Sequence, residues 1–157
     1  MSARVVSSGG GEKGRQAVRR RGTKHRRIRT LIVDDSPFVV QRLETFFKEQ
    51  NGFEVVGVAS NGVEAVERVG RLKPDLIVMD IQMPEMDGLE ATRRIKAGKD
   101  APVVIMLTLE GSASARAEAK EAGADDFVAK APKVYSALRA AIQRAFPRMK
   151  LSYENLS

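Results

Sequence analysis

Five short apolar runs alternate with helix-like segments along most of this 157-residue chain. The runs cover residues 28–33, 53–59, 75–79, 102–107 and 125–129. Each run has the length and apolar character of a buried strand, and each is followed by a segment with helix signals. Strands that alternate with helices form a parallel sheet covered by helices on both faces. The sequence therefore predicts an α/β fold built as (βα)5.

The segments between the runs carry the signals of helix starts. The last helix is expected to begin at Pro132. In the helix after the second run, Val63, Val66 and Val69 are the expected inward positions. The helix over residues 112–122 has almost only alanine at its inward positions, so it should bury little apolar area. The expected N-caps of the first three helices are Ser36, Asn61 and Asp87.

Polar side chains stand where four of the predicted strands end. Asp34 and Asp35 follow the first run, Asp80 the third, Thr108 the fourth and Lys130 the fifth. The carboxyl ends of parallel strands meet at one edge of the sheet, where ligands of open α/β folds bind. Taken singly, each residue has an ordinary structural explanation, such as an acid at a helix start. Together, five chemically complementary groups at one edge predict a functional site.

The residue types at this edge suggest magnesium-assisted phosphoryl transfer. Clustered carboxylates repel one another and favour a hard divalent cation such as Mg²⁺. An ammonium and a hydroxyl group can neutralise phosphoryl oxygens together with the metal. A carboxylate can also be the nucleophile, which gives an acyl phosphate. The sequence has no Walker-type glycine-rich loop, so it gives no support to nucleotide binding.

These residues resemble the receiver domain of two-component response regulators. The matching motifs are Asp34-Asp35-Ser36, Asp80 with the stretch 83–88 (MPEMDG), Thr108 and Lys130, in the family's order over residues 29–146. The resemblance implies a flavodoxin-like fold with strand order 2-1-3-4-5. It also implies that Asp80 accepts a phosphoryl group from a sensor histidine kinase or a phosphotransfer protein.

The resemblance assigns a role to each residue at the edge. Asp35 and Asp80 would bind Mg²⁺ directly, together with the backbone carbonyl of Gln82, whereas Asp34 would act on the metal mainly through water. The remaining contacts, those with the phosphoryl oxygens, would come from Thr108 and Lys130.

Phe127 occupies the position of the family's switch aromatic, which turns inward when Thr108 moves toward the phosphoryl group. Read from the residues alone, Phe127 is better explained as an ordinary strand aromatic. The implied switch changes the face made by residues 112–122, 125–129 and 132–146, which would bind a downstream protein. Such a domain is a signalling receiver and not an enzyme.

Two residues depart from the family pattern. Lys130 is followed by Ala131, with proline only at the next position, although the family commonly has proline directly after the lysine. A cis peptide before Ala131 would be costly. Leu109 follows Thr108, where the family often has a small residue, and a larger side chain there would slow the entry of small phosphodonors.

Charge divides the chain into a basic tail and a nearly neutral domain. Residues 1–29 hold ten Lys or Arg and one acid, which accounts for the positive net charge of +7. We expect residues 1–27 to be a disordered, solvated tail, residues 28–147 to form the receiver domain and residues 148–157 to be a short C-terminal tail. Contact with nucleic acid is expected at most through the basic tail, which has no aromatic residue to stack on bases.

Composition and length narrow the cellular setting. The chain has no cysteine, and no apolar run approaches the roughly 20 residues that span a bilayer. We therefore expect a cytoplasmic protein without membrane insertion. Eleven residues follow Phe146, which predicts a single-domain regulator acting through a partner protein. Ser36-Pro37-Phe38 and the stretch 54–69 also resemble the receivers of chemotaxis methylesterases.

Two other functions remain open at the sequence level. A receiver that is never phosphorylated would serve as a docking module. A Mg²⁺-dependent phosphatase with an aspartyl nucleophile would use the same carboxylates, but such enzymes usually place a general-acid Asp two residues after the nucleophile. That position is Gln82 here.

Overall fold

The computed structural model describes residues 26–148 of the chain. Strands and helices alternate throughout, as predicted. The expected tails overlap this part only at Arg26, Arg27 and Arg148 and otherwise lie outside the described residues. The elements are β1 (Ile28–Val33), α2 (Pro37–Glu49), β2 (Phe53–Ala59), α3 (Gly62–Leu72), β3 (Leu76–Asp80), α4 (Gly88–Lys96), β4 (Val103–Thr108), α5 (Ala113–Ala122), β5 (Asp126–Ala129) and α6 (Val134–Ala145).

The five strands form one parallel sheet in the order β2-β1-β3-β4-β5. This confirms the predicted flavodoxin-like (βα)5 topology. β3 lies at the centre, and all its residues are buried because helices cover both of its faces. None of the described helices is long and apolar enough to cross a membrane.

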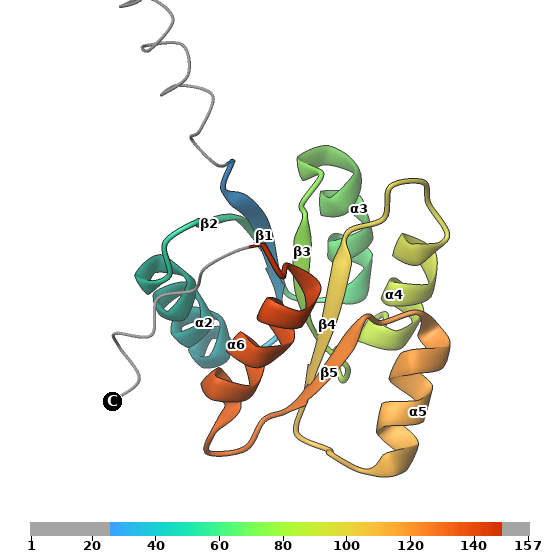
Figure 1. The fold of residues 1–157 in the computed structure, drawn as a ribbon. Coiled ribbons are helices and arrows are strands. Elements are labelled where there is room, and N and C mark those ends of the chain that lie inside the picture. The colour runs from blue at the N-terminus through green and yellow to red at the C-terminus, as the bar shows by residue number, and fades with distance from the viewer. Residues whose placement is uncertain (1–25, 149–157) are drawn as a thin grey trace, which may run out of the picture.

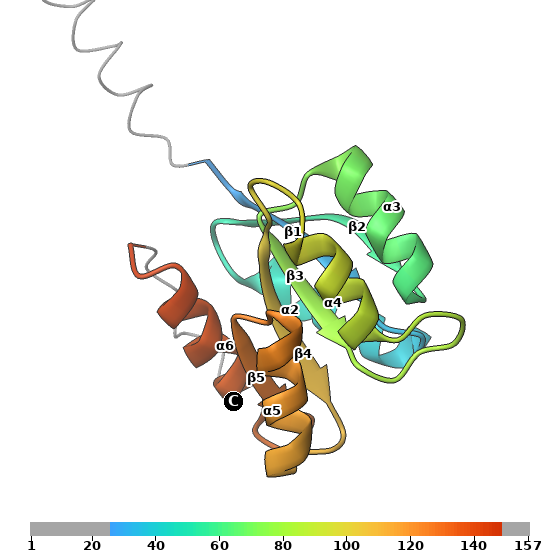
Figure 2. The same cartoon turned by 90° about the vertical axis from the view of Figure 1, so that its right-hand side faces the viewer.

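Helices cover the sheet as two layers (Figure 1). α2 and α6 lie on one face, where Leu43, Phe47 and Leu138 join the core beneath them. α3, α4 and α5 lie side by side on the other face (Figure 2). The core under these three helices includes Ala91 and Ile95. The buried residues of α5 are two alanines, as predicted, so α5 packs with little apolar area.

The predicted helix starts are confirmed for the first three helices. Ser36, Asn61 and Asp87 each accept a hydrogen bond from a backbone N–H three residues ahead. The prediction for the last helix is wrong, because α6 begins at Val134 and Pro132 lies in a preceding turn. This turn is closed by the Val134 N–H, which donates to the Ala131 carbonyl at 2.9 Å.

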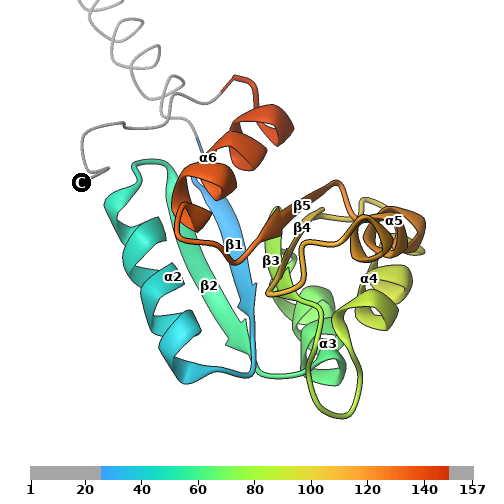
Figure 3. The ribbon, with the colours of Figure 1, turned by 90° about the horizontal axis from the view of Figure 1, so that it is seen from below.

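The carboxyl ends of the strands converge at one edge of the sheet (Figure 3). Asp80 and Thr108 are the last residues of β3 and β4. In the register of the sheet, Asp80 stands beside Leu107, and Thr108 stands beside Ala129. The chain segments that follow β1 and β5 begin at the same edge, so Asp34 and Lys130 are brought there too.

Candidate functional site

Three carboxylates form the centre of the site. Oxygen atoms of Asp34, Asp35 and Asp80 all lie within 4.8 Å of one another. Asp34 and Asp80 are buried, whereas Asp35 is exposed. A compact set of carboxylate oxygens that is open on one side suits a hard cation, which completes its shell with water or substrate oxygens. The donor set therefore fits Mg²⁺.

Lys130 connects the buried carboxylates. Its Nζ lies 2.8 Å from Asp34 Oδ2 and 3.4 Å from Asp80 Oδ1. The Lys130 backbone is fixed as well, because its N–H donates to the Thr108 carbonyl at 2.6 Å. The peptide bond between Lys130 and Ala131 is trans, so the alanine there needs no unusual backbone.

The second oxygen of Asp34 is also engaged. Asp34 Oδ1 accepts a hydrogen bond from the Ser36 N–H at 2.9 Å, while Ser36 itself caps α2. Both carboxylate oxygens of Asp34 thus have donors, one from Lys130 and one from the start of α2. Asp34 is buried with both oxygens bonded, whereas Asp35 is exposed.

The surroundings of Asp80 disfavour its charge. Burial, together with the negative charge of Asp34, raises the pKa of Asp80 from 3.8 to about 6, although Lys130 acts in the opposite direction. At neutral pH Asp80 is still mainly ionised. It is therefore a carboxylate whose desolvation and charge repulsion would be relieved by a cation.

This raised pKa predicts how an Asp80→Asn substitution affects stability. Between about pH 4 and pH 6 the folded protein binds more protons at Asp80 than the unfolded chain, so the wild type loses stability as the pH rises through this window. Without divalent cations, Asp80→Asn should raise the free energy of unfolding by about 2 kcal/mol above pH 6 and by little below pH 4. Urea unfolding at both pH values measures this. A variant that is less stable than the wild type above pH 6 would contradict it.

Thr108 and Phe127 lie on the neighbouring strands. Thr108 is buried, and its Oγ1 accepts a hydrogen bond from the Glu110 N–H at 3.2 Å. Phe127 stands beside Met106 in the sheet, and 7% of its surface is exposed. Gln82, in contrast, follows β3 with an exposed side chain.

The sequence profile of the response regulator receiver domain matches residues 30–143. The chain belongs to this family. Receiver domains bind Mg²⁺ through an acidic cluster, and this receiver brings Asp34, Asp35 and Asp80 together as such a group.

Curated relatives include protein-glutamate methylesterases/protein-glutamine glutaminases. The enzyme of Alkalilimnicola ehrlichii is 46% identical over 106 residues, which are 66% of this chain and 27% of the enzyme. That of Nocardioides sp. is 42% identical over 128 residues, 78% of this chain and 35% of the enzyme. The chain thus spans about a quarter to a third of these relatives. The match covers their receiver part, which is not itself enzymatic.

Solved receiver structures have the same fold. The response regulator domain of Thermotoga maritima CheB superposes with a TM-score of 0.70 at 38% identity, over 80% of this chain and all of that domain. A Borrelia burgdorferi structure, a CheX–CheY complex with BeF₃ and Mg²⁺, gives a TM-score of 0.70 at 30% identity, over 76% of this chain and 89% of that one.

The receiver has one important site residue that sequence reasoning missed, Gly88. A Cβ there would overlap the backbone carbonyl oxygen of Asp80 and lie 3.0 Å from Met79 Cγ. The Gly88 N–H donates to the Ile81 carbonyl at 2.7 Å, which folds the loop after β3 tightly back. The Asp87-Gly88 pair was recognisable as a turn, but nothing in the sequence shows that this turn packs on Asp80.

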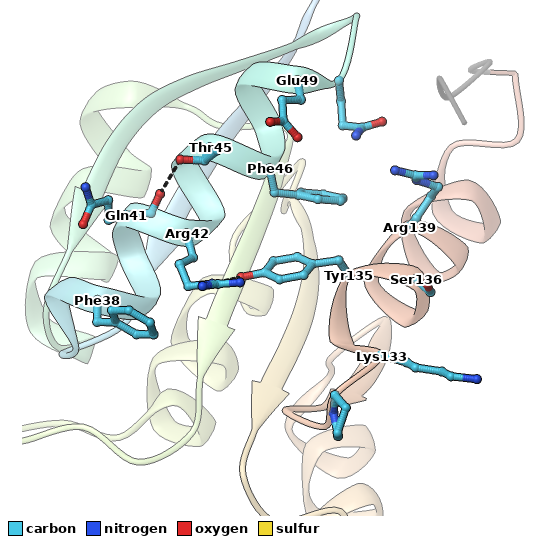
Figure 4. A pocket seen from close by; sticks show the side chains of 12 residues that line it. Phe38, Gln41, Arg42, Thr45, Phe46, Glu49, Lys133, Tyr135, Ser136 and Arg139 are labelled. Atoms are coloured by element: carbon cyan, nitrogen blue, oxygen red, sulfur yellow. Dashed lines mark hydrogen bonds between the residues drawn. The ribbon is translucent and has the colours of Figure 1, made fainter. Parts of the chain in front are cut away.

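A groove of about 1000 Å³ lies between α2 and α6 (Figure 4). The guanidinium of Arg42 lies 5.5 Å from the ring centroid of Phe38 and 5.9 Å from that of Tyr135. Its Nε also donates to the Tyr135 hydroxyl at 3.2 Å. Phe38 remains 66% exposed, so the groove presents an aromatic surface at the start of α2.

Proposed function

We propose that Asp80 is the phosphoryl acceptor of this receiver and that a histidine kinase or phosphotransfer protein is the donor. A carboxylate oxygen of Asp80 would attack the phosphorus of a phosphohistidine. The P–N bond breaks, the imidazole leaves with the bonding electron pair, and an acyl phosphate forms at Asp80. The observation that carries the proposal is that Asp80 stands at the end of the central strand, in one carboxylate cluster with Asp34 and Asp35 and 3.4 Å from the Lys130 ammonium.

The same geometry supports a division of labour around Mg²⁺, which would neutralise charge on the transferring group. Asp35 and Asp80 would bind the ion directly, with the backbone carbonyl of Gln82. Asp34 would act mainly through water, since both of its oxygens already accept hydrogen bonds. The carboxylates supply oxygen ligands only, as Mg²⁺ prefers.

Thr108 and Lys130 would contact the phosphoryl oxygens after transfer. Lys130 already lies beside Asp80, and Thr108 ends the adjacent strand. Movement of Thr108 toward the new charge would favour the inward position of Phe127 and alter the face formed by α5, β5 and α6. A downstream protein would read this face, which makes the switch a local charge event with a structural output.

We also propose that the receiver domain extends over residues 28–147. In addition, we propose that it acts in a chemotaxis signalling pathway. The proposed limits enclose the matched residues 30–143. The chemotaxis setting rests on the methylesterase relatives and on the structural likeness to CheB and CheY receivers.

Intact-mass measurement after incubation with Mg²⁺ and acetyl phosphate tests the acceptor. The wild type should gain the mass of one phosphoryl group, and Asp80→Asn should gain none. Asp100→Asn is the matched control, because Asp100 lies in a turn with φ 54°, which asparagine also accepts. Incorporation into Asp80→Asn would overturn the proposal.

The intact-mass experiment, together with an assay of phosphate release from a small phosphomonoester, separates the two alternatives. A docking module would show no incorporation and no phosphate release. An aspartyl phosphatase would release phosphate over many turnovers from a small phosphomonoester. Gln82 stands where such a phosphatase would have its general-acid Asp, and an amide side chain does not donate a proton to a leaving group. This residue therefore argues against the phosphatase.

Leu109 should slow small phosphodonors. Its side chain is 78% exposed and lines a depression next to Lys130. Leu109→Ala should therefore raise the rate of phosphorylation by acetyl phosphate severalfold, because it opens the mouth of the site. The rate is measured by stopping the phosphorylation reaction at successive times and determining the phosphorylated fraction by intact mass. Equal rates for the variant and the wild type would contradict this expectation.

A further inference from the structure

Arg116 of α5 covers the ring of Phe127. The guanidinium carbon of Arg116 lies 4.9 Å from the centroid of the Phe127 ring. Phe127 belongs to the core under α3, α4 and α5, together with Met106 and Ala119, whereas Arg116 itself is exposed. The charged group therefore closes the ring off from solvent at the surface between α5 and β5.

This contact matters because α5 has little else to hold it. Its buried side chains are Ala119 and Ala122, which contribute small apolar areas. Within residues 26–148, no carboxylate lies within ion-pair distance of Arg116. The guanidinium is thus available to the aromatic face, an arrangement that attracts arginine electrostatically and by stacking.

We propose that Arg116 is a positioning residue that holds Phe127 inward before phosphorylation and couples α5 to this side chain. The switching part of the proposal rests on the proposed function of Asp80. A phenylalanine has no hydroxyl group to anchor it, so its inward position depends on packing and on the covering cation. An exposed cation–π contact corresponds to a bias of about two- to fivefold toward the inward arrangement. The unphosphorylated receiver would then already occupy part of the switched state.

NMR spectroscopy of the protein without Mg²⁺ or phosphodonor tests the holding role. The side-chain protons of Arg116 should show an upfield ring-current shift that Phe127→Leu abolishes. Arg116→Ala should move the Phe127 ring signals toward values of an exposed ring, and Arg116→Lys should restore them in part. Lys120→Ala, which removes an exposed cation from the same helix, is the control and should leave them unchanged.

Titration with beryllofluoride and Mg²⁺ then tests the coupling. Arg116→Ala should need about two- to fivefold more beryllofluoride for half of the switch, because the inward arrangement has lost its support. The inference would be overturned if Arg116→Ala had the same Phe127 ring signals and the same beryllofluoride midpoint as Lys120→Ala. If no variant responds to beryllofluoride at all, the proposal for Asp80 fails, while the signals of the free protein still decide whether Arg116 holds Phe127.

Discussion

Gly88→Ala is expected to lower the free energy of unfolding by about 3 kcal/mol, which places it among the most damaging single substitutions in this receiver. The added Cβ would meet the backbone carbonyl of Asp80, which cannot move without disturbing the end of β3. Either the domain unfolds more easily or the loop after β3 shifts. Both outcomes displace Asp80 from the other carboxylates, so phosphorylation should fall as well.

Gly70→Ala is the matched control for this prediction. Gly70 lies in α3, and a Cβ there would meet nothing within 4 Å. The substitution should raise the free energy of unfolding by up to about 1 kcal/mol, because alanine favours a helix over glycine. Urea unfolding of the two variants should therefore give changes of opposite sign. A Gly88→Ala protein as stable as Gly70→Ala would show that the close approach to Asp80 is not important.

Lys130→Ala is expected to lower the free energy of unfolding about as much as Gly88→Ala, but for a different reason. Removal of the Lys130 side chain leaves two buried carboxylates, Asp34 and Asp80, without their shared ammonium. Loss of one partner from a buried ion pair costs about 3 kcal/mol or more. Mg²⁺ should narrow the gap to the wild type, since a bound divalent cation supplies the missing positive charge and stabilises the folded state.

Thermal or urea unfolding with EDTA and with excess Mg²⁺ measures both parts of this prediction. Lys133→Ala is the control, because Lys133 is exposed and stands only three residues further along the chain. Its effect should stay within about 0.5 kcal/mol. If the gap between Lys130→Ala and the wild type were the same with and without Mg²⁺, the charge explanation would be wrong.

The alternation of strands and helices was predictable because its signals are local. Residues 76–79 form a wholly apolar run that ends directly before Asp80. Ser36 and Asp87 each cap a helix by bonding a backbone N–H three residues ahead. The convergence of Asp34, Asp80 and Lys130 followed from one topological rule, that parallel strands end at the same edge.

What could not be predicted depends on contacts between distant residues. The prediction that Val63 faces inward is wrong: Val63 is 40% exposed, whereas Ala65, two residues further along α3, is buried. Helical spacing alone leaves the inward face uncertain by one or two residues. The packing of Gly88 on Asp80 and of Arg116 on Phe127 arises only when loops and helices settle against one another.

The Lys130–Asp34 ion pair joins residues that are 96 positions apart in the chain. A ribosome must therefore deliver β5 before the acidic cluster acquires its cationic partner. A nascent chain that ends before residue 130 holds all three carboxylates but not the ammonium that sits between two of them. The charge balance of the acidic cluster is thus completed only by the last strand of the sheet.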